Sequence, residues 1–480
     1  MTRARASSVA HAFSLFLLGF VPRLVVAHLL AGEPVWDGHY YDFGARRIAG
    51  GFGYSDDLDL GGHAVWHPWC HYPVGYSAYL AIFYRVLGAT QGAAHLANAL
   101  VGGLLVVVTW QLARSWLSPR RALVAAVIVA LHPGLVLYGA LLMTEPLAAL
   151  LTLSSFAVAT RWRTRAGLVA AALVLGVGAL VRPQALLCAP FLALALWPSL
   201  SSLARRARAA RLGVAAAIAC VVALVPVAPW TARNCAVMDG CALVSTNAGW
   251  NLAIGAFPRA TGRFETLRSA DGCRDVTGQV QQDRCWWRYG VSHIMARPGR
   301  WLALMPKKLA YTFDHESFAV EYLREARPSA WPETRRLLVR GGATGFHRVL
   351  LCAAAFAGVT VFWRRSADER ARRRARAQVA LLAAIGLVTI AGLGAEPPTF
   401  WAIAVVAVLV PLLPIPGRPP LEPGLLMCVA LLGSTLLTHA IFFGEDRYHV
   451  VVTPALALLA ASALREQNAR GASASAERRG

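Results

Sequence analysis

The sequence predicts an all-α polytopic membrane protein with about 12 transmembrane helices and two extracytoplasmic regions. Hydrophobic residues make up 57% of the 480 residues, and the mean hydropathy is +0.50. Charged residues make up only 15%, against about 25% in an ordinary soluble domain. Because about 20 apolar residues cross a bilayer as a helix, this composition excludes a soluble enzyme, a disordered chain and a fibrous repeat.

Apolar segments predict where the spans lie, at residues 9–31, 92–114, 121–141, 144–160, 166–181, 184–198, 213–231, 346–363, 378–395, 397–414, 425–443 and 449–464. Arginine-rich stretches at 161–165, 205–211 and 364–376 separate some of these segments. With the N-terminus inside, the short arginine-rich loops all fall on the cytoplasmic side, as the positive-inside rule requires. The first segment lacks a clear cleavage site, so it is expected to be an anchor rather than a signal peptide.

We attribute the net charge of +22 to the arginine-rich loops rather than to a nucleic-acid-binding surface. Of the 47 basic residues, 45 are arginines, because Lys307 and Lys308 are the only lysines. A nucleic-acid-binding protein would carry a soluble module with interleaved basic and aromatic residues, and the sequence has none. We therefore expect no nucleic-acid partner.

The topology divides the chain into a cytoplasmic arm with the first helix (1–32), a first extracytoplasmic loop (33–91), transmembrane helices (92–231), a small extracytoplasmic domain (232–345), C-terminal transmembrane helices (346–464) and a disordered cytoplasmic tail (465–480). An amphipathic stretch at 281–295 predicts a helix in the small domain. Four of the nine cysteines fall there, and an even set in an oxidising compartment predicts disulfides. Local pairing of Cys235 with Cys241 and of Cys273 with Cys285 is one of three connectivities, and free thiols are the alternative.

The first extracytoplasmic loop combines acids, aromatics and histidines. Between residues 33 and 75 it holds six acids against two arginines, together with Trp36, Tyr40, Tyr41 and several histidines. A connecting loop needs none of these, so the pattern predicts a site for a carbohydrate or a polar headgroup. An interfacial aromatic belt is the alternative.

Asp37 begins a stretch with helical spacing inside this loop. Asp37, Tyr41 and Ala45 recur four residues apart on one face, and the glycines at 50–53 predict the end of the helix. A carboxylate at this position would be placed to act as a general base on an acceptor hydroxyl or amine. It would equally be placed to cap the helix, and spacing alone leaves both open.

Metal and nucleotide motifs are weak. His67, Cys70 and His71 offer a single thiol at loose spacing, which does not favour zinc. The acids at 56–59 only approximate an acidic pair, so no metal ligand is predicted and a divalent metal is left open. The sequence lacks the glycine-rich pattern of a phosphate-binding loop, which argues against direct use of ATP or a nucleotide sugar.

Five motifs in order resemble the GT-C superfamily of glycosyltransferases that use polyprenyl-phosphate sugars. That superfamily includes the protein O-mannosyltransferases, aminoarabinose transferases and Rgt-type galacturonosyltransferases. The motifs follow the Asp37 segment and are 71-HYPVGY-76, 144-TEPLAALL-151, 180-LVRPQALL-187, the block from 229 to 262 that contains 245-STNAG-249, and 444-GEDRYHVVVTP-454. The resemblance covers about 30–265 and 440–462, and the second proline of the usual proline-rich element is Val74 here.

The resemblance implies an inverting transferase in which Asp37 is the catalytic base. It implies that Arg182 and Arg447 hold the lipid phosphate, and a charge near membrane depth does require a partner or a function. Snorkelling of either arginine to the interface is the alternative. The other substrate-binding candidates are Tyr41, Asp42, His71, Glu145, Tyr448 and His449. Glu145 would bind the sugar or pair with Arg182, and Asp42 would assist the base or pair with Arg46.

The expected partners are a polyprenyl-phosphate-linked sugar, the bilayer, and a glycolipid, polysaccharide or protein acceptor. The expected location is the bacterial inner membrane, with the site on the periplasmic face. A multi-span transporter or lipid flippase is the alternative, and it predicts inverted repeats with discontinuous helices. A non-catalytic assembly factor is a further alternative, which would tolerate any change at Asp37. The sequence assigns no role to Arg23, which lies within the first apolar segment.

Overall fold

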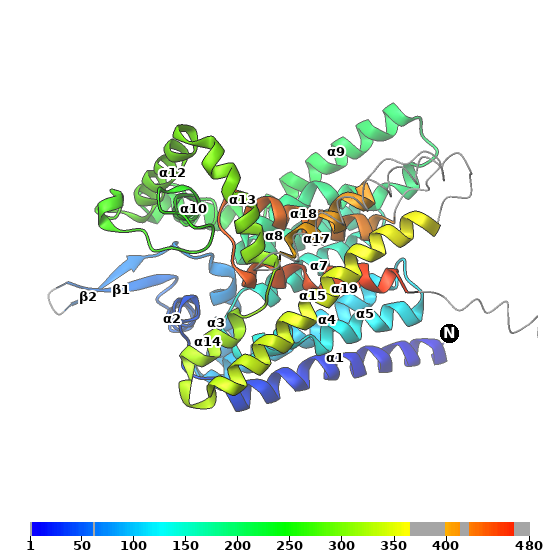
Figure 1. Cartoon of the computed structure of the whole chain (residues 1–480), viewed down its shortest axis with the longest axis horizontal. Helices are drawn as coiled ribbons and strands as arrows, with labels where there is room; N and C mark the ends of the chain where they lie inside the picture. The colour runs from blue at the N-terminus through cyan, green and yellow to red at the C-terminus, as the bar shows by residue number, and fades with distance from the viewer. Residues whose placement is uncertain (1, 61–62, 365–398, 413–421, 465–480) are drawn as a thin grey trace, which may run out of the picture.

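The computed structural model describes residues 2–60, 63–364, 399–412 and 422–464, and helices dominate these residues (Figure 1). The α-helices are α1 (Thr2–Leu30), α2 (Asp37–Ala49), α3 (Val74–Leu87), α4 (Gln91–Ala113), α5 (Pro119–Leu131), α6 (Pro133–Leu137), α7 (Glu145–Arg161), α8 (Arg165–Val181), α9 (Arg205–Leu224), α10 (Ala228–Val237), α11 (Ala248–Ala256), α12 (Gln279–Ala296), α13 (Pro298–Phe313), α14 (Phe318–Ala326), α15 (Glu333–Arg364), α17 (Trp401–Leu412), α18 (Pro423–Ile441) and α19 (Thr453–Ser462).

Short 3-10 helices connect several of them, namely η1 (Tyr138–Ala140), η2 (Pro183–Leu196), η3 (Pro198–Leu200), η4 (Ser269–Asp271), η5 (Pro328–Ala330) and η6 (Asp446–Val452). Within the described residues the sheet is one antiparallel hairpin, in which β1 (Ser55–Leu60) pairs with β2 (His63–Pro68). Ser55 lies opposite Pro68, and Leu60 lies opposite His63. The helical fold class is confirmed, and the hairpin is an addition that the sequence did not predict.

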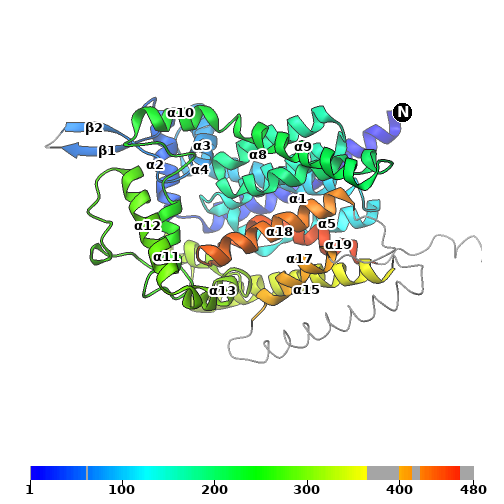
Figure 2. The ribbon, with the colours of Figure 1, turned by 90° about the horizontal axis from the view of Figure 1, so that it is seen from above.

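The long apolar helices pack side by side into a bundle (Figures 1 and 2). Helix α1 packs on α4, α4 packs on α5 and α7, and α7 packs on α8. On the other side of the bundle α15 packs on α17 and α19. Small residues permit the close approach of α1 and α4, because a methyl group added at Gly103 would lie 2.7 Å from the ring of Phe16. Such small-residue contacts are typical of helix packing in membranes.

The helix predicted at 121–141 is broken at His132, and α5 and α6 meet there at an angle of 54°. Pro133 starts α6 and cannot donate a backbone hydrogen bond to the preceding turn. The buried guanidinium of Arg23 donates to the carbonyls of Ala130 and Val129, at 3.1 Å each. Arg23 therefore satisfies carbonyl groups that the broken helix leaves without partners.

Among the residues that the structure describes, four helices are long and apolar enough to cross a membrane, at Ser8–Leu30, Gln91–Ala113, Arg205–Leu224 and Pro423–Ile441. The bent pair of α5 and α6 would make a fifth span. Several shorter apolar helices, such as α8, pack among them. These helices support a multi-pass membrane protein, but they do not reach the twelve predicted spans.

Part of the difference between the predicted and the observed number of spans has two causes. One predicted span contains a proline, and another lies outside the described residues. The predicted span 184–198 is the 3-10 helix η2, which contains Pro190. The predicted span 449–464 is divided between η6 and α19. The predicted span 378–395, the arginine-rich stretch after Arg364 and the tail 465–480 lie outside the described residues.

The hairpin, α2 and the helices α10 to α13 gather at the end of the molecule opposite the N-terminal end of α1 (Figures 1 and 2). Disulfides join Cys235 to Cys241 and Cys273 to Cys285 within this end layer. The local connectivity is thus the one formed, and the amphipathic stretch 281–295 is part of α12. Helix α3 is apolar and packs on α8, although the sequence placed its residues in a loop.

Candidate functional site

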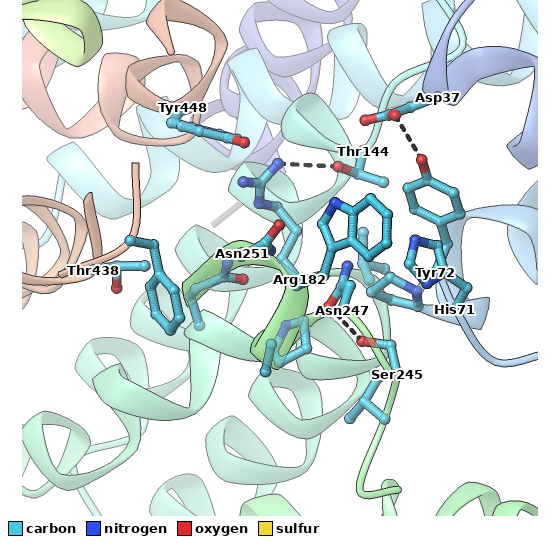
Figure 3. A pocket seen from close by; sticks show the side chains of 18 of the residues that line it. Asp37, His71, Tyr72, Thr144, Arg182, Ser245, Asn247, Asn251, Thr438 and Tyr448 are labelled. Atoms are coloured by element: carbon cyan, nitrogen blue, oxygen red, sulfur yellow. Dashed lines mark hydrogen bonds between the residues drawn. The ribbon is translucent and has the colours of Figure 1, made fainter. Parts of the chain in front are cut away.

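A cavity of about 360 Å³ lies where the end layer meets the helix bundle (Figure 3). Elements from the whole length of the chain line it, because α2, the start of α7, the start of η2, the start of α11, the end of α18 and η6 all contribute. The predicted site residues that line the cavity are Asp37, Tyr41, His71, Glu145, Arg182, Arg447 and Tyr448. Seven of the nine predicted residues therefore share one cavity.

Asp37 is the first residue of α2, and the packing of the preceding residue, Trp36, holds it in place. Trp36 adopts a left-handed backbone with φ 49°, a conformation that costs energy for any residue but glycine. The Trp36 ring packs on the rings of Phe318 and Tyr322, with centroids 5.4 and 5.7 Å away. This packing fixes the turn that carries Asp37 into the cavity. Asp37 makes no cap with its own side chain, because the cap residue is Trp36.

The two oxygens of the Asp37 carboxylate have different partners. Oδ1 accepts a hydrogen bond of 2.8 Å from the hydroxyl of Tyr72, and Oδ2 accepts one of 2.5 Å from Nη1 of Arg447. Burial raises the pKa of Asp37, but the charge and hydrogen bond of Arg447 and the hydrogen bond of Tyr72 outweigh it. The pKa of Asp37 therefore lies below its ordinary value, and the carboxylate is ionised at neutral pH.

Arg182 is held by the start of α7. Its Nη1 donates to Oε1 of Glu145 at 2.7 Å and to the hydroxyl of Thr144 at 3.2 Å. The Glu145 side chain is fully buried, and its Oε2 has no hydrogen-bond partner in the part of the chain that the structure describes. Glu145 thus pairs with Arg182 through Oε1, and its Oε2 is a buried acceptor atom that the described residues leave unsatisfied.

Arg447 and Tyr448 lie on η6, at the far side of the cavity from α2. The centroid of the Tyr448 ring lies 5.2 Å from the guanidinium carbon of Arg182 and 5.0 Å from that of Arg447. Nη2 of Arg447 donates to the Tyr448 hydroxyl at 3.2 Å. Both guanidinium groups therefore approach one aromatic ring, which places two positive charges at one wall of the cavity.

Glu445 adds an acid beside Arg447, with an Oε2 to Nε distance of 2.7 Å. The two groups form an ion pair without the geometry of a hydrogen bond, because neither atom has a hydrogen-bond partner among the described residues. Burial raises the pKa of Glu445 to about 7, against the opposing charge of Arg447. Glu445 therefore changes its charge near neutral pH, next to the arginine that holds Asp37.

Two predicted residues lie elsewhere. Asp42 faces away from the cavity and bonds the side chains of Arg46, at 2.7 Å, and Tyr84. His449 is fully buried, and its Nδ1 lies 2.7 Å from the carbonyl oxygen of Thr312. Neither residue lines the cavity, so the structure gives no support for a contact of either one with substrate.

Several cavity residues were not singled out from the sequence. The hydroxyl of Tyr72 reaches Asp37, yet in the sequence it is only one aromatic among many. Ser245 and Asn247 line the cavity (Figure 3). They belong to the motif 245-STNAG-249, which resembles the family block but predicts no role for either residue. Trp250 follows this motif, and Asp283 accepts hydrogen bonds from the backbone of Gly249 and Trp250. That motif was the one signal that could have identified this wall.

The arrangement combines a base with a site for an anion. Arg182 and Arg447 present guanidinium groups, which bind phosphate oxygens in a planar, charge-assisted way. Asp37 is an ionised carboxylate that would accept a proton. The hydroxyls, amides and aromatic rings of Tyr72, Ser245 and the neighbouring wall would contact a polar ligand with apolar faces.

Comparison with known proteins gives one family match. A family model described as dolichyl-phosphate-mannose-protein mannosyltransferase matches residues 71–230. No curated protein matches the chain. The matched residues include the motifs at 71–76, 144–151 and 180–187, and with them Glu145 and Arg182. Asp37 and Arg447 lie outside the match.

Among solved structures, the chain is similar to the oligosaccharyltransferase of Archaeoglobus fulgidus tethered with an acceptor peptide, at 12% identity and a TM-score of 0.46, over 94% of this chain and 49% of that one. It is also similar to ArnT from Cupriavidus metallidurans bound to undecaprenyl phosphate, at 16% identity and a TM-score of 0.35, over 96% and 78%. The chain spans about half the length of the archaeal protein. The family match over residues 71–230 confirms, for that part of the chain, the resemblance to the GT-C glycosyltransferases.

Proposed function

We propose that this protein is an integral-membrane glycosyltransferase that moves a sugar from a polyprenyl-phosphate donor to an extracytoplasmic acceptor. The observation that carries the proposal is the cavity in which an ionised Asp37 faces Arg182 and Arg447. The family match over residues 71–230 includes Arg182 and Glu145 and supports the proposal. A polyprenyl-phosphate sugar would place its phosphate at the two arginines and its sugar toward Asp37.

Binding of the donor would open the ion pair between Asp37 and Arg447. In the structure this pair stabilises the carboxylate and lowers the pKa of Asp37, which makes it a weak base. A lipid phosphate offers Arg447 another anion with more oxygens to bind. Once Arg447 turns to the phosphate, Asp37 would lose its strongest stabilising partner and become a better base. The donor would thus activate the residue that it needs.

The reaction itself would be a single displacement. The acceptor hydroxyl or amine attacks the anomeric carbon, its proton passes to Asp37, and a new bond to the anomeric carbon forms. The bond between the anomeric carbon and the phosphate oxygen breaks, and the lipid phosphate leaves as an anion. Arg182 and Arg447 would stabilise the charge that develops on it. Because attack and departure take place on opposite faces, the anomeric configuration would invert.

The wall opposite the arginines would hold the sugar and the acceptor. Glu145 lies beside Arg182 rather than on this wall, and its Oε1 would position that arginine for the phosphate. His71 lies edge-on to both Tyr72 and Trp250, with centroids 5.0 and 6.1 Å away. Burial lowers the pKa of His71, although the charge of Asp37 opposes this. His71 is therefore neutral at pH 7 and would act as a hydrogen-bonding group rather than a second cation.

We place the cavity on the extracytoplasmic face of a bacterial inner membrane, in a chain with about 12 spans. The disulfides Cys235–Cys241 and Cys273–Cys285 support this side, because such bonds persist in oxidising compartments. The first joins α10 to the loop that follows it, and the second joins the loop before α12 to α12 itself. Helix α12 packs on α11, which lines the cavity. The layer that carries the disulfides and the cavity therefore share one face.

The test is transfer from a panel of polyprenyl-phosphate sugars by the purified protein, with release of polyprenyl phosphate as the readout. We expect one donor to react and release to depend on acceptor. The same protein in sealed vesicles separates the transporter alternative, which predicts movement of a lipid or solute without release. Movement across the vesicle with no release from any donor in the panel would overturn the proposal.

A further inference from the structure

A second cluster of polar residues lies buried behind η6, separate from the cavity. It consists of Glu316, in the turn between α13 and α14, His347 of α15, and His449 of η6. Both histidines are fully buried, and Glu316 is 3% exposed. One ligand atom from each residue lies within 4.8 Å of the other two. His449 was predicted to bind substrate, but this cluster is where its side chain lies.

Hydrogen bonds to backbone carbonyls fix which nitrogen of each histidine carries a proton. Nδ1 of His449 lies 2.7 Å from the oxygen of Thr312, and Nε2 of His347 lies 2.9 Å from the oxygen of Phe313. A carbonyl oxygen only accepts, so these two nitrogens are the donors. In the neutral rings, Nε2 of His449 and Nδ1 of His347 are left with lone pairs. Such outer hydrogen bonds are what orient histidines that bind metals.

Several polar atoms in this cluster have no protein partner. Nδ1 of His347 and Oε1 of Glu316 are buried and make no hydrogen bond within the described chain. Oε2 of Glu316 lies 3.5 Å from Nε2 of His449, which has no proton to donate in this tautomer. Leaving a buried donor or acceptor unsatisfied costs about 1–3 kcal/mol. The three residues therefore each offer an electron-pair donor atom, and one cation would satisfy all three.

His132 completes the surroundings without being a ligand. Its Nδ1 accepts a hydrogen bond from the backbone of Leu135, so its Nε2 carries the proton. That Nε2 lies 3.7 Å from Oε2 of Glu316. Gly134, two residues on, makes room for the carboxylate, since a methyl group there would overlap Oε1 of Glu316 at 1.2 Å. His132 and Gly134 are positioning residues for Glu316.

We propose that Glu316, His347 and His449 bind one divalent transition-metal ion, and that this ion is zinc. Two imidazoles and one carboxylate form a donor set that zinc takes in proteins, with water as a fourth ligand. Ligand atoms in a tetrahedral zinc site lie about 3.3 Å apart. Oε2 of Glu316 and Nε2 of His449 are already 3.5 Å apart, and the three ligand atoms lie within 4.8 Å of one another, so inward movements of about 1 Å or less would close the site. The rings of His347 and His449 now stack at 3.8 Å and would splay as their lone pairs converge.

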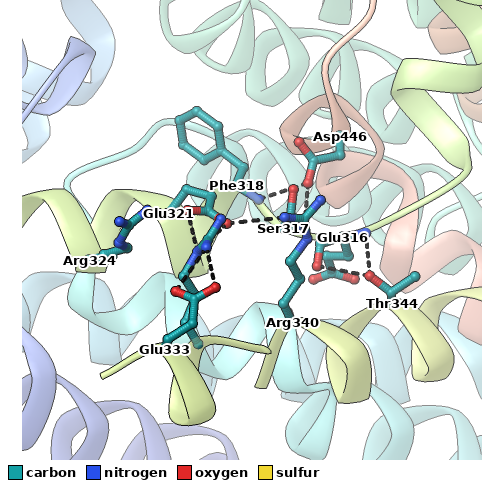
Figure 4. A network of polar contacts seen from close by, with 10 residues as sticks. Glu316, Ser317, Phe318, Glu321, Arg324, Glu333, Arg340, Thr344 and Asp446 are labelled. Carbon is teal, nitrogen blue, oxygen red and sulfur yellow. Dashed lines mark hydrogen bonds and ion pairs between the residues drawn. The ribbon is translucent and has the colours of Figure 1, made fainter. Parts of the chain in front are cut away.

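The site would join the segment that carries Arg447 to two other elements. His449 follows Arg447 by two residues on η6, while Thr312 and Phe313 end α13. Asp446 on η6 accepts hydrogen bonds from the backbone of Ser317 and Phe318, which binds η6 to the start of α14 (Figure 4). A metal ion bound by His347 and His449 would link α15 to η6 as well. Its role would be to position η6, and it would take no part in the chemistry.

The test is metal analysis of the full-length protein purified in detergent after growth with zinc. We expect about one zinc per chain in the wild type and less than about one tenth of that in Glu316→Gln and His347→Ala. Gly134→Ala keeps all three ligands but displaces the Glu316 carboxylate, so it should also lose zinc. His95→Gln is the matched control, because His95 is a buried histidine of α4 outside the cluster. Cys70→Ser controls for the His67, Cys70 and His71 segment. Both controls should keep wild-type zinc.

Cobalt replacement tests the wild type directly, so the proposal does not depend on a variant that folds. Cobalt added to metal-free protein should give visible bands of four-coordinate cobalt without thiolate charge-transfer bands, and one equivalent of zinc should remove them. The proposal is overturned if the wild type binds neither zinc nor cobalt, or if Glu316→Gln and His347→Ala retain as much zinc as His95→Gln. None of these readouts depends on transferase activity, so the proposed function can fail or hold independently.

Discussion

Asp37 and Arg447 lie 410 positions apart in the sequence, and Nη1 of Arg447 lies 2.5 Å from a carboxylate oxygen of Asp37. The pair joins the first residue of α2 to the 3-10 helix η6 across the cavity. It explains why Asp37 is ionised and why it is a weak base before a donor arrives.

Replacing Tyr72 with phenylalanine should shift the acid limb of the pH profile. The Tyr72 hydroxyl bonds Oδ1 of Asp37 and helps to lower the pKa of Asp37. Without it the pKa rises, and because activity is lost as pH falls through that pKa, the loss should begin at a higher pH. At pH 7 Asp37 stays ionised in the variant, so the rate there should change by less than about tenfold. The pH dependence of kcat/KM measures this, and an unmoved acid limb would contradict the role of Tyr72.

Donor affinity should weaken as pH rises through about 7, the value to which burial raises the pKa of Glu445. Below that pH Glu445 is neutral, and above it the carboxylate competes with the donor phosphate for Arg447 and repels it. The KM for donor should therefore rise several-fold between about pH 6 and pH 8. Glu445→Gln should remove this dependence and keep the low KM, measured over the same range. A Glu445→Gln profile that still rises would place the titrating group elsewhere.

Replacing either cavity arginine with lysine should weaken donor binding by about tenfold to a hundredfold, because lysine lacks the planar fork. Lysine is the cleaner change at Arg182, since alanine would leave the buried Glu145 charge unpaired. The double variant should lose less than the sum of the two, because both residues hold one group.

Arg46→Lys is the matched control for these changes, because Arg46 pairs with Asp42 away from the cavity. Direct binding of a polyprenyl phosphate, measured by quenching or calorimetry, gives the affinities. Full retention of affinity in both cavity variants would indicate that Arg182 and Arg447 serve the fold alone.

Reduction should affect the end layer rather than the bundle. Mapping of non-reduced peptides should find Cys235 joined to Cys241 and Cys273 joined to Cys285. Loss of the second bond by Cys273→Ser and Cys285→Ser should cost about 2–4 kcal/mol of local stability, seen as faster hydrogen exchange in α12. Recovery of all four cysteines as free thiols from unreduced protein would refute this pairing.

Local patterns predicted much of this structure. Apolar length predicted the bounds of α4 and α18 closely and the C-terminal end of α1, although α1 begins earlier than predicted, and the spacing of Asp37, Tyr41 and Ala45 predicted α2. The family resemblance then predicted most of the candidate site residues that line the cavity. These features depend on neighbouring residues or on motifs, which a single sequence displays directly.

Long-range contacts were beyond the sequence. Asp37 and Arg447 pair because α2 and η6, which are far apart in the sequence, meet in the fold. No local sequence pattern encodes that contact. The orientation of His449 depends on the Thr312 carbonyl of another helix, so its place beside Arg447 in the sequence suggested a substrate contact. The bend at His132 depends on Arg23 of α1 as well as on Pro133.

The most direct test of the central claim compares release of polyprenyl phosphate by wild type, Asp37→Asn and Asp42→Asn under single-turnover conditions. Asp42 is the matched control, because it lies on the same helix but outside the cavity. Asp37→Asn should bind donor yet release it about 10²–10⁴-fold more slowly, as expected for loss of a general base. Asp42→Asn should stay within about threefold of the wild type, as expected away from the reacting groups. Release by Asp37→Asn at the wild-type rate would contradict the assignment of Asp37 as the base.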